Sequence, residues 1–422
     1  MRAFRNCSAA LGLAWLGLTA GMAGAEPAFM GSLDALAPAG EITWGKTITL
    51  TPPGQTLGRY PRLVQLKTGA HAGDLLLTYQ TELNGGDFMQ YRSSDKGQTW
   101  TGPQVINKAT SDWDFASCNV IELEDGRLLM TMQRRKVGSN LGGDYYMDVK
   151  YSSDGGETWG KPQQVFQGAN WEGRPMQVPH DANGDGIDDI YLFFTQRIIE
   201  TTLAAADASR KGDNGRGVAY IASYDAGKTW VDPNAERYTG KLIHRNFDLR
   251  RGIAKTEDGR SGGGMPQPFL LPDNRVGFVV EEANMKESPY IVANDPGDWD
   301  WTGKDFQGPW TSADYDGKGD RKVYPTSPQN AWPATTTSFG NGPYASVLPD
   351  GRIIMASRNE KVVAVWLGDK TAHNFKFEDL PFGRTPTAYP FVEAIGDNQI
   401  LVAGGAQGKK DNFIMLRFGT VK

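Results

Sequence analysis

Short apolar runs recur along the chain, and most of them follow a turn of the Asp-Gly or Asp-Asn type. They are rich in Leu, Ile, Val and aromatic residues and have the length of a single strand, which is typical of strands buried in a sheet. The six runs that resemble one another cover residues 74–80, 127–133, 189–195, 275–281, 352–358 and 399–405. Their recurrence predicts six similar β units, and therefore an all-β fold.

A second repeat has the pattern S-x-D-x-G-x-T-W and occurs at residues 93–100, 152–159 and 223–230. Each copy follows a β-rich aromatic run, as the tip of a hairpin would. The Asp is expected to accept backbone N–H groups in the turn, the Gly to take a positive φ, and the Trp to pack back over the hairpin. Residues 295–297, near Trp299, look like a degenerate fourth copy.

These three segments resemble the Asp-boxes (BNR repeats) of the sialidase superfamily. The resemblance implies a six-bladed β-propeller in which the boxes lie on the outer rim, away from the active site. Six units of about 60 residues account for the chain once an N-terminal leader is removed. We therefore expect a single propeller domain over residues 26–422, in which residues 26–55 supply a closing strand. Residues 232–265 and 303–340 are expected to be long loops.

The N-terminus has the pattern of a secretory signal peptide. Arg2 and Arg5 precede an apolar stretch at residues 9–18, and Ala23-Gly24-Ala25 is a small-residue cleavage site. Residues 1–25 are therefore predicted to be removed, and the protein to be secreted or periplasmic. Cys118 would then be the remaining cysteine, which rules out an intramolecular disulfide.

Composition narrows the classes of partner. The chain has 44 Lys and Arg against 49 Asp and Glu, a net charge of −5, and no basic run, which disfavours a nucleic-acid partner. No second segment is long and apolar enough to span a membrane. Glycine, at 52 of 422 residues, indicates many tight turns. We expect a monomer.

Residues 181–189 read D-x-N-x-D-G-x-x-D, a spacing that suits a hard cation because it brings several oxygen atoms onto one tight loop. The expected ligands are four side chains and one backbone carbonyl, from Asp181, Asn183, Asp185, Asp189 and, through its carbonyl, Ile187. The sequence predicts a structural calcium ion here, the alternative being a metal-free turn rich in Asp and Gly.

Two segments carry candidate chemistry. Trp171-Glu172 precedes the third apolar run, and Glu281-Glu282 ends the fourth. A carboxylate beside an apolar strand is costly unless it faces solvent, a partner or a site. Successive strand residues point to opposite faces, so only one of Glu281 and Glu282 can face the centre. The position of Glu281 matches those of Gln80, Gln133 and Arg358 in the other runs, which favours Glu281.

The W-E-x-x-P element, together with Gly264-Met265-Pro266 and a strand that ends in Glu, resembles the exo-α-1,5-L-arabinanases. That family consists of six-bladed propellers that are retaining glycosidases with two catalytic Glu. The resemblance implies that Glu172 is the acid/base and Glu281 the nucleophile, with carboxyl groups about 5–5.5 Å apart. It also implies an exo-acting enzyme on a plant polysaccharide such as α-1,5-L-arabinan. The sugar contacts that it suggests are Tyr60, Arg62 and Trp171.

Two other functions stay open. Arg59-Tyr60-Pro61 resembles the R-x-P element of sialidases, and residues 344–351 resemble their segment with a tyrosine nucleophile, which would be Tyr344. Such an enzyme would use Asp87 as acid/base and arginines for the substrate carboxylate, and the candidates for these are Arg59, Arg251 and Arg358. The third alternative is a non-catalytic, glycan-binding propeller.

Overall fold

The computed structural model describes residues 38–54, 56–82, 85–138, 144–168, 170–197, 216–231, 264–274, 276–281, 291–293, 341–359, 361–370, 375–406 and 412–422. The predicted signal peptide, the degenerate fourth repeat at residues 295–297, Arg251 and Glu282 lie outside these residues. Most of the two predicted long loops also lies outside them. Within the described part, no helix is long and apolar enough to cross a membrane.

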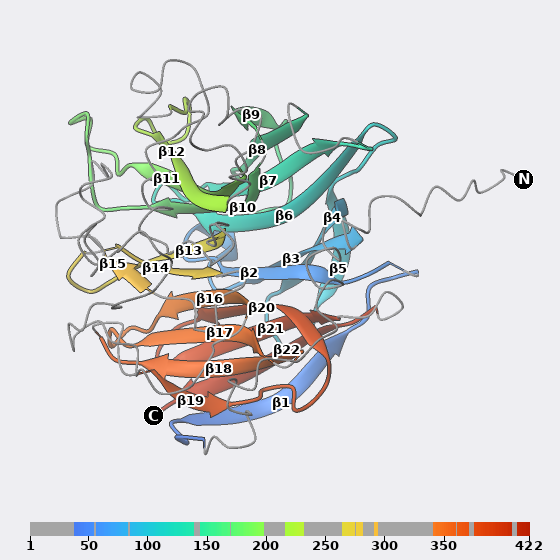
Figure 1. Cartoon of the computed structure of the whole chain (residues 1–422), viewed down its shortest axis with the longest axis vertical. Coiled ribbons are helices and arrows are strands. Elements are labelled where there is room, and N and C mark those ends of the chain that lie inside the picture. The colour runs from blue at the N-terminus through green and yellow to red at the C-terminus, as the bar shows by residue number, and fades with distance from the viewer. Residues whose placement is uncertain are drawn as a thin grey trace, which may run out of the picture.

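The described strands form six antiparallel sheets of three or four strands (Figure 1). The first three sheets along the chain are β2 (Arg59–Gln65), β3 (Leu75–Glu82), β4 (Gly85–Ser93) and β5 (Thr101–Asn107); β6 (Trp113–Glu122), β7 (Leu128–Lys136), β8 (Tyr145–Ser152) and β9 (Gln163–Gln167); and β10 (Asn170–Gln177), β11 (Ile190–Arg197) and β12 (Arg216–Ser223). A 3-10 turn, η2 (Gly69–His71), connects β2 to β3.

The other three sheets are β13 (Gly264–Leu270), β14 (Val276–Glu281) and β15 (Ile291–Ala293); β16 (Asn341–Val347), β17 (Ile353–Asn359), β18 (Val362–Gly368) and β19 (Lys376–Asp379); and β20 (Thr387–Ala394), β21 (Gln399–Ala406), β22 (Ile414–Val421) and β1 (Ile42–Leu50). The six apolar runs of the sequence are thus β3, β7, β11, β14, β17 and β21, the second strand of each sheet.

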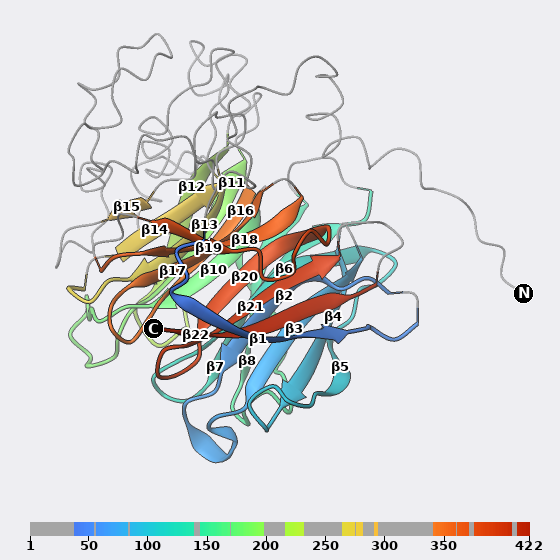
Figure 2. The same cartoon turned by 90° about the horizontal axis from the view of Figure 1, so that it is seen from below.

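The first strands of the sheets form a closed ring of contacts, in the order β2, β6, β10, β13, β16, β20 and back to β2. Figure 2 shows these strands gathered toward the middle of the molecule. The ring is closed by chain ends: β1 pairs antiparallel with β22, from Ile42↔Val421 to Leu50↔Ile414, and lies as a blue strand among red ones in Figures 1 and 2. The predicted β-propeller and the predicted closing strand from the N-terminal segment are confirmed.

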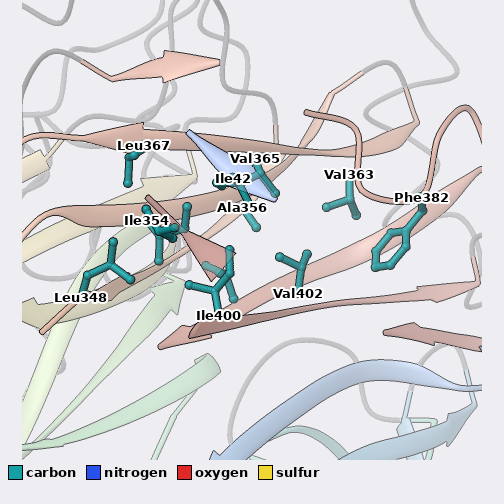
Figure 3. Close-up of a cluster of buried hydrophobic side chains, with 12 residues drawn as sticks. Ile42, Leu348, Ile354, Ala356, Val363, Val365, Leu367, Phe382, Ile400 and Val402 are labelled. Carbon is teal, nitrogen blue, oxygen red and sulfur yellow. The ribbon is translucent and has the colours of Figure 1, made fainter. Parts of the chain in front are cut away.

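The hydrophobic core lies between neighbouring sheets. Figure 3 shows one such layer, in which Ile354 and Val365 of one sheet pack against Ile400 and Val402 of the next. Similar clusters fill four other interfaces between sheets, including the one between the sheets that contain β3 and β21. Since both faces of a sheet are covered, the second strands are apolar throughout rather than alternating.

The three S-x-D-x-G-x-T-W segments fold into the same turn. In the first, Asp95 accepts the backbone N–H of Thr99 at 2.9 Å and its hydroxyl at 2.6 Å, and the Ser93 hydroxyl accepts the N–H of Gly97 at 2.7 Å. The corresponding bonds recur at residues 152–158 and 223–229. The glycine at the fifth position of each turn, Gly97, Gly156 or Gly227, has a positive φ of 82–87°. The turn geometry predicted from the sequence is therefore confirmed.

These turns also hold neighbouring sheets together. Arg92 in β4 donates to the carbonyl of Gly155 in the second turn at 2.6 Å, and Arg127 donates to the carbonyl of Ala226 in the third turn at 2.7 Å. The second and third turns therefore each receive a hydrogen bond from the preceding sheet.

Candidate functional site

Every first strand carries a bulge near its beginning, where two residues have no partner in the second strand. The register shifts lie between Arg59 and Arg62, Ala116 and Asn119, Trp171 and Arg174, Gly264 and Gln267, Asn341 and Tyr344, and Ala388 and Phe391. The first bulged residue always has a positive φ, between 47° and 57°. We call these six residues the bulge ring: Tyr60, Ser117, Glu172, Met265, Gly342 and Tyr389.

The bulge ring stores backbone strain at the centre of the propeller. Five of its six members have a Cβ atom, and the left-handed conformation costs a non-glycine residue about 1–2 kcal/mol. Its members meet across sheet boundaries: the rings of Tyr60 and Tyr389 have centroids 4.0 Å apart. Bulges of this kind re-aim a side chain, and here they do so at the six equivalent places nearest the axis.

Glu172 is the carboxylate of the bulge ring. Its side chain is buried, with 5% exposed, and its Oε2 accepts a hydrogen bond from the Thr195 hydroxyl at 3.0 Å. Arg62 and Tyr389 are close enough to interact with its charge. A buried carboxylate with a donor and a cation nearby can act as a general acid, a general base or a nucleophile.

The backbone on both sides of Glu172 is fixed by the neighbouring sheet. Gln133 donates through its side-chain amide to the carbonyl of Asn170. Asn119 and Thr131 both donate to the carbonyl of Gly173, each at 2.7 Å. A Cβ at Gly173 would lie 2.6 Å from Sδ of Met147, so a larger residue there would have to push the buried Met147 side chain aside. The carboxylate is therefore presented by a preorganised segment.

Two arginines and a tyrosine meet next to the bulge ring. The guanidinium carbon of Arg62 lies 4.9 Å from the ring centroid of Tyr344, and that of Arg174 lies 4.6 Å from it. These residues come from three different sheets, so their side chains meet near the axis. Burial lowers the pKa of both arginines to about 10, so both stay cationic at neutral pH. Burial raises the pKa of Glu393 to about 7, although Arg174 opposes this.

The residues suggested as sugar contacts have different surroundings. Arg62 is only 3% exposed and donates to the carbonyl of Pro61 at 2.8 Å. Tyr60 is 8% exposed, and its ring packs against that of Tyr389 at an angle of 33°. Trp171 is half-buried, with its ring centroid 5.9 Å from that of Tyr145. Of the three, Trp171 has the most surface for a ligand.

Glu281 ends β14, and its backbone pairs with Gly264, the residue before Met265 of the bulge ring. The equivalent pairs in other sheets are Arg59↔Gln80, Ala116↔Gln133 and Asn341↔Arg358. Glu281 therefore occupies the register position that the sequence comparison assigned to it. Glu172 and Glu281 belong to consecutive sheets, β10–β12 and β13–β15.

The residues suggested for a sialidase are partly assembled. Arg59 and Arg358 both lie near Tyr389, where their charges oppose the rise that burial causes in its pKa. Tyr344 is only 1% exposed and packs against Phe391 at 4.4 Å between ring centroids. The carboxylate of Asp87 accepts the backbone N–H of Ala109 at 2.8 Å.

The proposed calcium loop connects β10 to β11. Asp181 accepts the N–H groups of Gly184 and Gly186, at 2.8 and 2.7 Å, which lower its pKa. Asp189 is fully buried and its Oδ2 lies 2.7 Å from Nδ1 of His180, while its Oδ1 has no hydrogen-bond partner. Within the described residues, no three His, Cys, Asp or Glu side chains are gathered as a metal site. The buried free oxygen of Asp189 is the feature that fits a cation.

Thr195 and Tyr389 were not singled out by the sequence. A signal for the bulge ring does exist: in four first strands the residue after the ring member is proline, at Pro61, Pro266, Pro343 and Pro390. Proline lacks an N–H donor and suits a bulged position. Tyr389-Pro390 repeats Tyr60-Pro61 and could have been found by that comparison.

No protein-family model matches the chain. A curated relative, a sialidase from Micromonospora viridifaciens, is 29% identical over 296 residues, which cover 65% of this chain and 41% of that protein. The chain thus matches less than half the length of this relative.

Solved structures resemble the whole propeller. A GH93 α-L-arabinofuranosidase of Fusarium graminearum, in complex with arabinobiose, is 17% identical, with a TM-score of 0.57 over 89% of this chain and 97% of that one. An α-L-arabinanase of Penicillium chrysogenum, also with arabinobiose, is 17% identical, with a TM-score of 0.54 over 89% and 98%. The chain has the sialidase-like β-propeller fold.

Proposed function

We propose that this protein is a glycoside hydrolase in which Glu172 and Glu281 form the catalytic pair. The observation that carries the proposal is the position of Glu172. It is the carboxylate of the bulge ring, buried near the axis, hydrogen-bonded to Thr195 and close to Arg62. Propellers with the same fold include glycosidases, according to their names.

A hydrogen-bond link between the two chain segments that carry Glu172 and Glu281 supports this pairing. Met265 donates its N–H to the hydroxyl of Thr195 at 2.7 Å, and that hydroxyl is bonded to Glu172. Gly264, next to Met265, is the register partner of Glu281. The chain segments that carry the two Glu are therefore linked through one hydroxyl group.

In the proposed reaction, Glu281 attacks the anomeric carbon while Glu172 protonates the departing glycosidic oxygen. Glu172 then removes a proton from water, which attacks the glycosyl–enzyme ester and releases Glu281 and a sugar of retained configuration. The substrate that we propose is the end of an α-1,5-L-arabinan or a similar plant polysaccharide. The two arabinobiose complexes among the similar structures support this choice.

The second candidate is a sialidase with Tyr344 as nucleophile. It is supported by the similarity to the Micromonospora viridifaciens sialidase and by the arginines around Tyr344 and Tyr389. Tyr344 and Glu172 are both buried, at 1% and 5% exposed, so exposure does not separate the two candidates. The third candidate is a glycan-binding propeller without catalysis.

The test is hydrolysis of linear arabinan and of an aryl sialoside by wild type, Glu172→Gln, Glu281→Gln and Tyr344→Phe. Glu41→Gln, which changes an exposed carboxylate, is the matched control. We expect short arabinose oligomers from wild type, Tyr344→Phe and Glu41→Gln, and at least a thousandfold less from either site variant. Release of sialic acid that is lost in Tyr344→Phe would establish the second candidate. Tight binding of arabinan with no hydrolysis would establish the third.

Three further proposals concern a metal ion, the cellular location and the oligomeric state. We propose a structural calcium ion on the loop of Asp181, Asn183, Asp185, Ile187 and Asp189, supported by the oxygen-rich spacing and by the buried free oxygen of Asp189. The loop residues would hold it, and it would stiffen the connection that precedes β11. We also propose export through a signal peptide at residues 1–25 and function as a monomer.

A further inference from the structure

Thr195 occupies a junction between three elements of the site. It lies in β11, opposite Trp171 in the register of β10, and is 2% exposed. Its hydroxyl contacts Oε2 of Glu172 at 3.0 Å and the backbone nitrogen of Met265 at 2.7 Å. One buried oxygen thus joins the sheet that carries Glu172 to the next sheet, which carries Glu281.

The direction of the two hydrogen bonds follows from the donors available. The N–H of Met265 can only donate, so the Thr195 oxygen has to accept there. The single hydroxyl hydrogen is then directed at the Glu172 oxygen. A hydrogen bond donated to a carboxylate favours its ionised form and fixes the orientation of the carboxyl plane.

The backbone amide is itself held in place. Met265 belongs to the bulge ring, with φ 49°, and is 5% exposed, so its N–H direction is set by the bulge. Thr195 therefore has little freedom to turn its hydroxyl elsewhere, because doing so would leave a buried N–H unsatisfied.

We propose that Thr195 is a positioning residue that orients the Glu172 carboxyl and sets its proton affinity. This inference rests on the proposed function only where it concerns turnover. The bond to Glu172 and its effect on the proton affinity of that carboxyl can be tested without a substrate.

The variants are Thr195→Val, which keeps the shape and removes the hydroxyl, and Thr195→Ser, which keeps the hydroxyl. Thr387→Val is the matched control: Thr387 is fully buried and its hydroxyl accepts the N–H of Val363 from the neighbouring sheet at 3.2 Å, with no bond to a carboxylate. If Thr195→Val does not fold, Thr195→Ala takes its place.

The first readout is the pKa of the Glu172 carboxyl. It is measured by carbon-13 NMR on protein labelled at its glutamate side chains, and the Glu172 signal is assigned with the Glu172→Gln variant. We expect a higher pKa in Thr195→Val than in wild type, and the wild-type value in Thr195→Ser and Thr387→Val. An equal pKa in wild type and Thr195→Val overturns the inference, whatever the protein hydrolyses.

The second readout is turnover. Loss of a hydrogen bond to a charged group corresponds to a ten- to hundredfold decrease in kcat. Since Glu172 is proposed as the acid, we expect the alkaline limb of the kcat/KM profile to move to higher pH in Thr195→Val and to return in Thr195→Ser. A shifted Glu172 pKa in a protein with no hydrolase activity would support the inference and refute the proposed function. If Thr195→Val lowers kcat but shifts neither the limbs of the pH profile nor the pKa of Glu172, then Thr195 has only a structural role. That result would refute the inference.

Discussion

Gly405 stands where four of the other sheets carry Gln, Glu or Arg, and replacing it by alanine should weaken the closure of the ring. Its register partner is Ala388, and the equivalent positions hold Gln80, Gln133 and Glu281, among others. A Cβ on Gly405 would lie 2.4 Å from the carbonyl oxygen of Gly58, on the chain that enters β2. The approach of one backbone to another therefore excludes any side chain at this position.

The size of the effect follows from that distance. A carbon and an oxygen without a covalent bond approach to about 3.3 Å, so the two backbones would have to separate by roughly 0.9 Å. Overpacking of this kind destabilises the folded state by about 1–3 kcal/mol. Alanine also lowers the conformational entropy of the unfolded chain, which offsets about 0.4–1 kcal/mol of this destabilisation. We expect Gly405→Ala to lower the free energy of unfolding by about 1–2 kcal/mol.

The assay is urea unfolding followed by tryptophan fluorescence, with the m-value compared between variants. Gly45→Ala in β1 of the same sheet is the control, because its new Cβ would lie 3.5 Å from the nearest atom, an ordinary contact. It should leave stability unchanged or raise it by up to about 1 kcal/mol. Equal stability of Gly405→Ala and wild type, at an unchanged m-value, would refute the argument from backbone contact.

Three other predictions follow from the charged groups. Although burial opposes it, hydrogen bonds from Thr158 and Ser152 hold the pKa of Asp154 at about 2, so they stabilise the fold above pH 4 and this contribution is lost as the pH falls from about 4 through 2. Asp154→Ala should cost about 1 kcal/mol at pH 7 by urea unfolding, and its difference from wild type should shrink steadily as the pH is lowered from 4 through 2. Burial raises the pKa of Glu393 to about 7. Wild type should therefore lose stability relative to Glu393→Gln as the pH rises from about 4.5 to 7. Curves of Tm against pH that run parallel for the two proteins would contradict this. Removal of calcium by a chelator should lower the Tm of wild type and of the control Asp188→Ala, which keeps the proposed ligands. It should not lower the Tm of Asp185→Ala, which lacks one of them. Equal changes in Tm for all three proteins would exclude the proposed site.

Much of the fold was predictable because it repeats. The second strands are buried on both faces, which leaves uninterrupted apolar runs, and the S-x-D-x-G-x-T-W turns are encoded by neighbouring residues such as Asp95 and Thr99. The closing strand was predicted from its place in the chain, and β1 pairs with β22 as expected.

The site was predictable only in part, because its contacts join residues that are far apart in the chain. The register of Glu281 could be read by aligning strand ends. The hydrogen bond between Thr195 and Met265 joins residues 70 positions apart, so no local sequence pattern predicts it. Likewise, Arg174 approaches Tyr344 across the axis, a contact that requires the ring to be closed in the correct order. The roles of Glu172 and Glu281 stay predictions.

In the bulge ring, the backbone conformation is shared by all six positions, whereas the side chain differs from one position to the next. All six first strands adopt the same positive-φ conformation, whether the residue is Ser117, Met265 or a tyrosine, so the conformation itself belongs to the propeller. A carboxylate occupies one of the six positions, and the polar side chains Gln133, Asn119 and Thr131 gather around the backbone of that bulge. Polar side chains hold the backbone of other bulges too: Gln80 accepts the N–H of Ser117 at 2.9 Å, and Thr195 accepts that of Met265 at 2.7 Å. The carboxylate itself is therefore what distinguishes the Glu172 position from the other five, and it is the structural reason for proposing the reaction there.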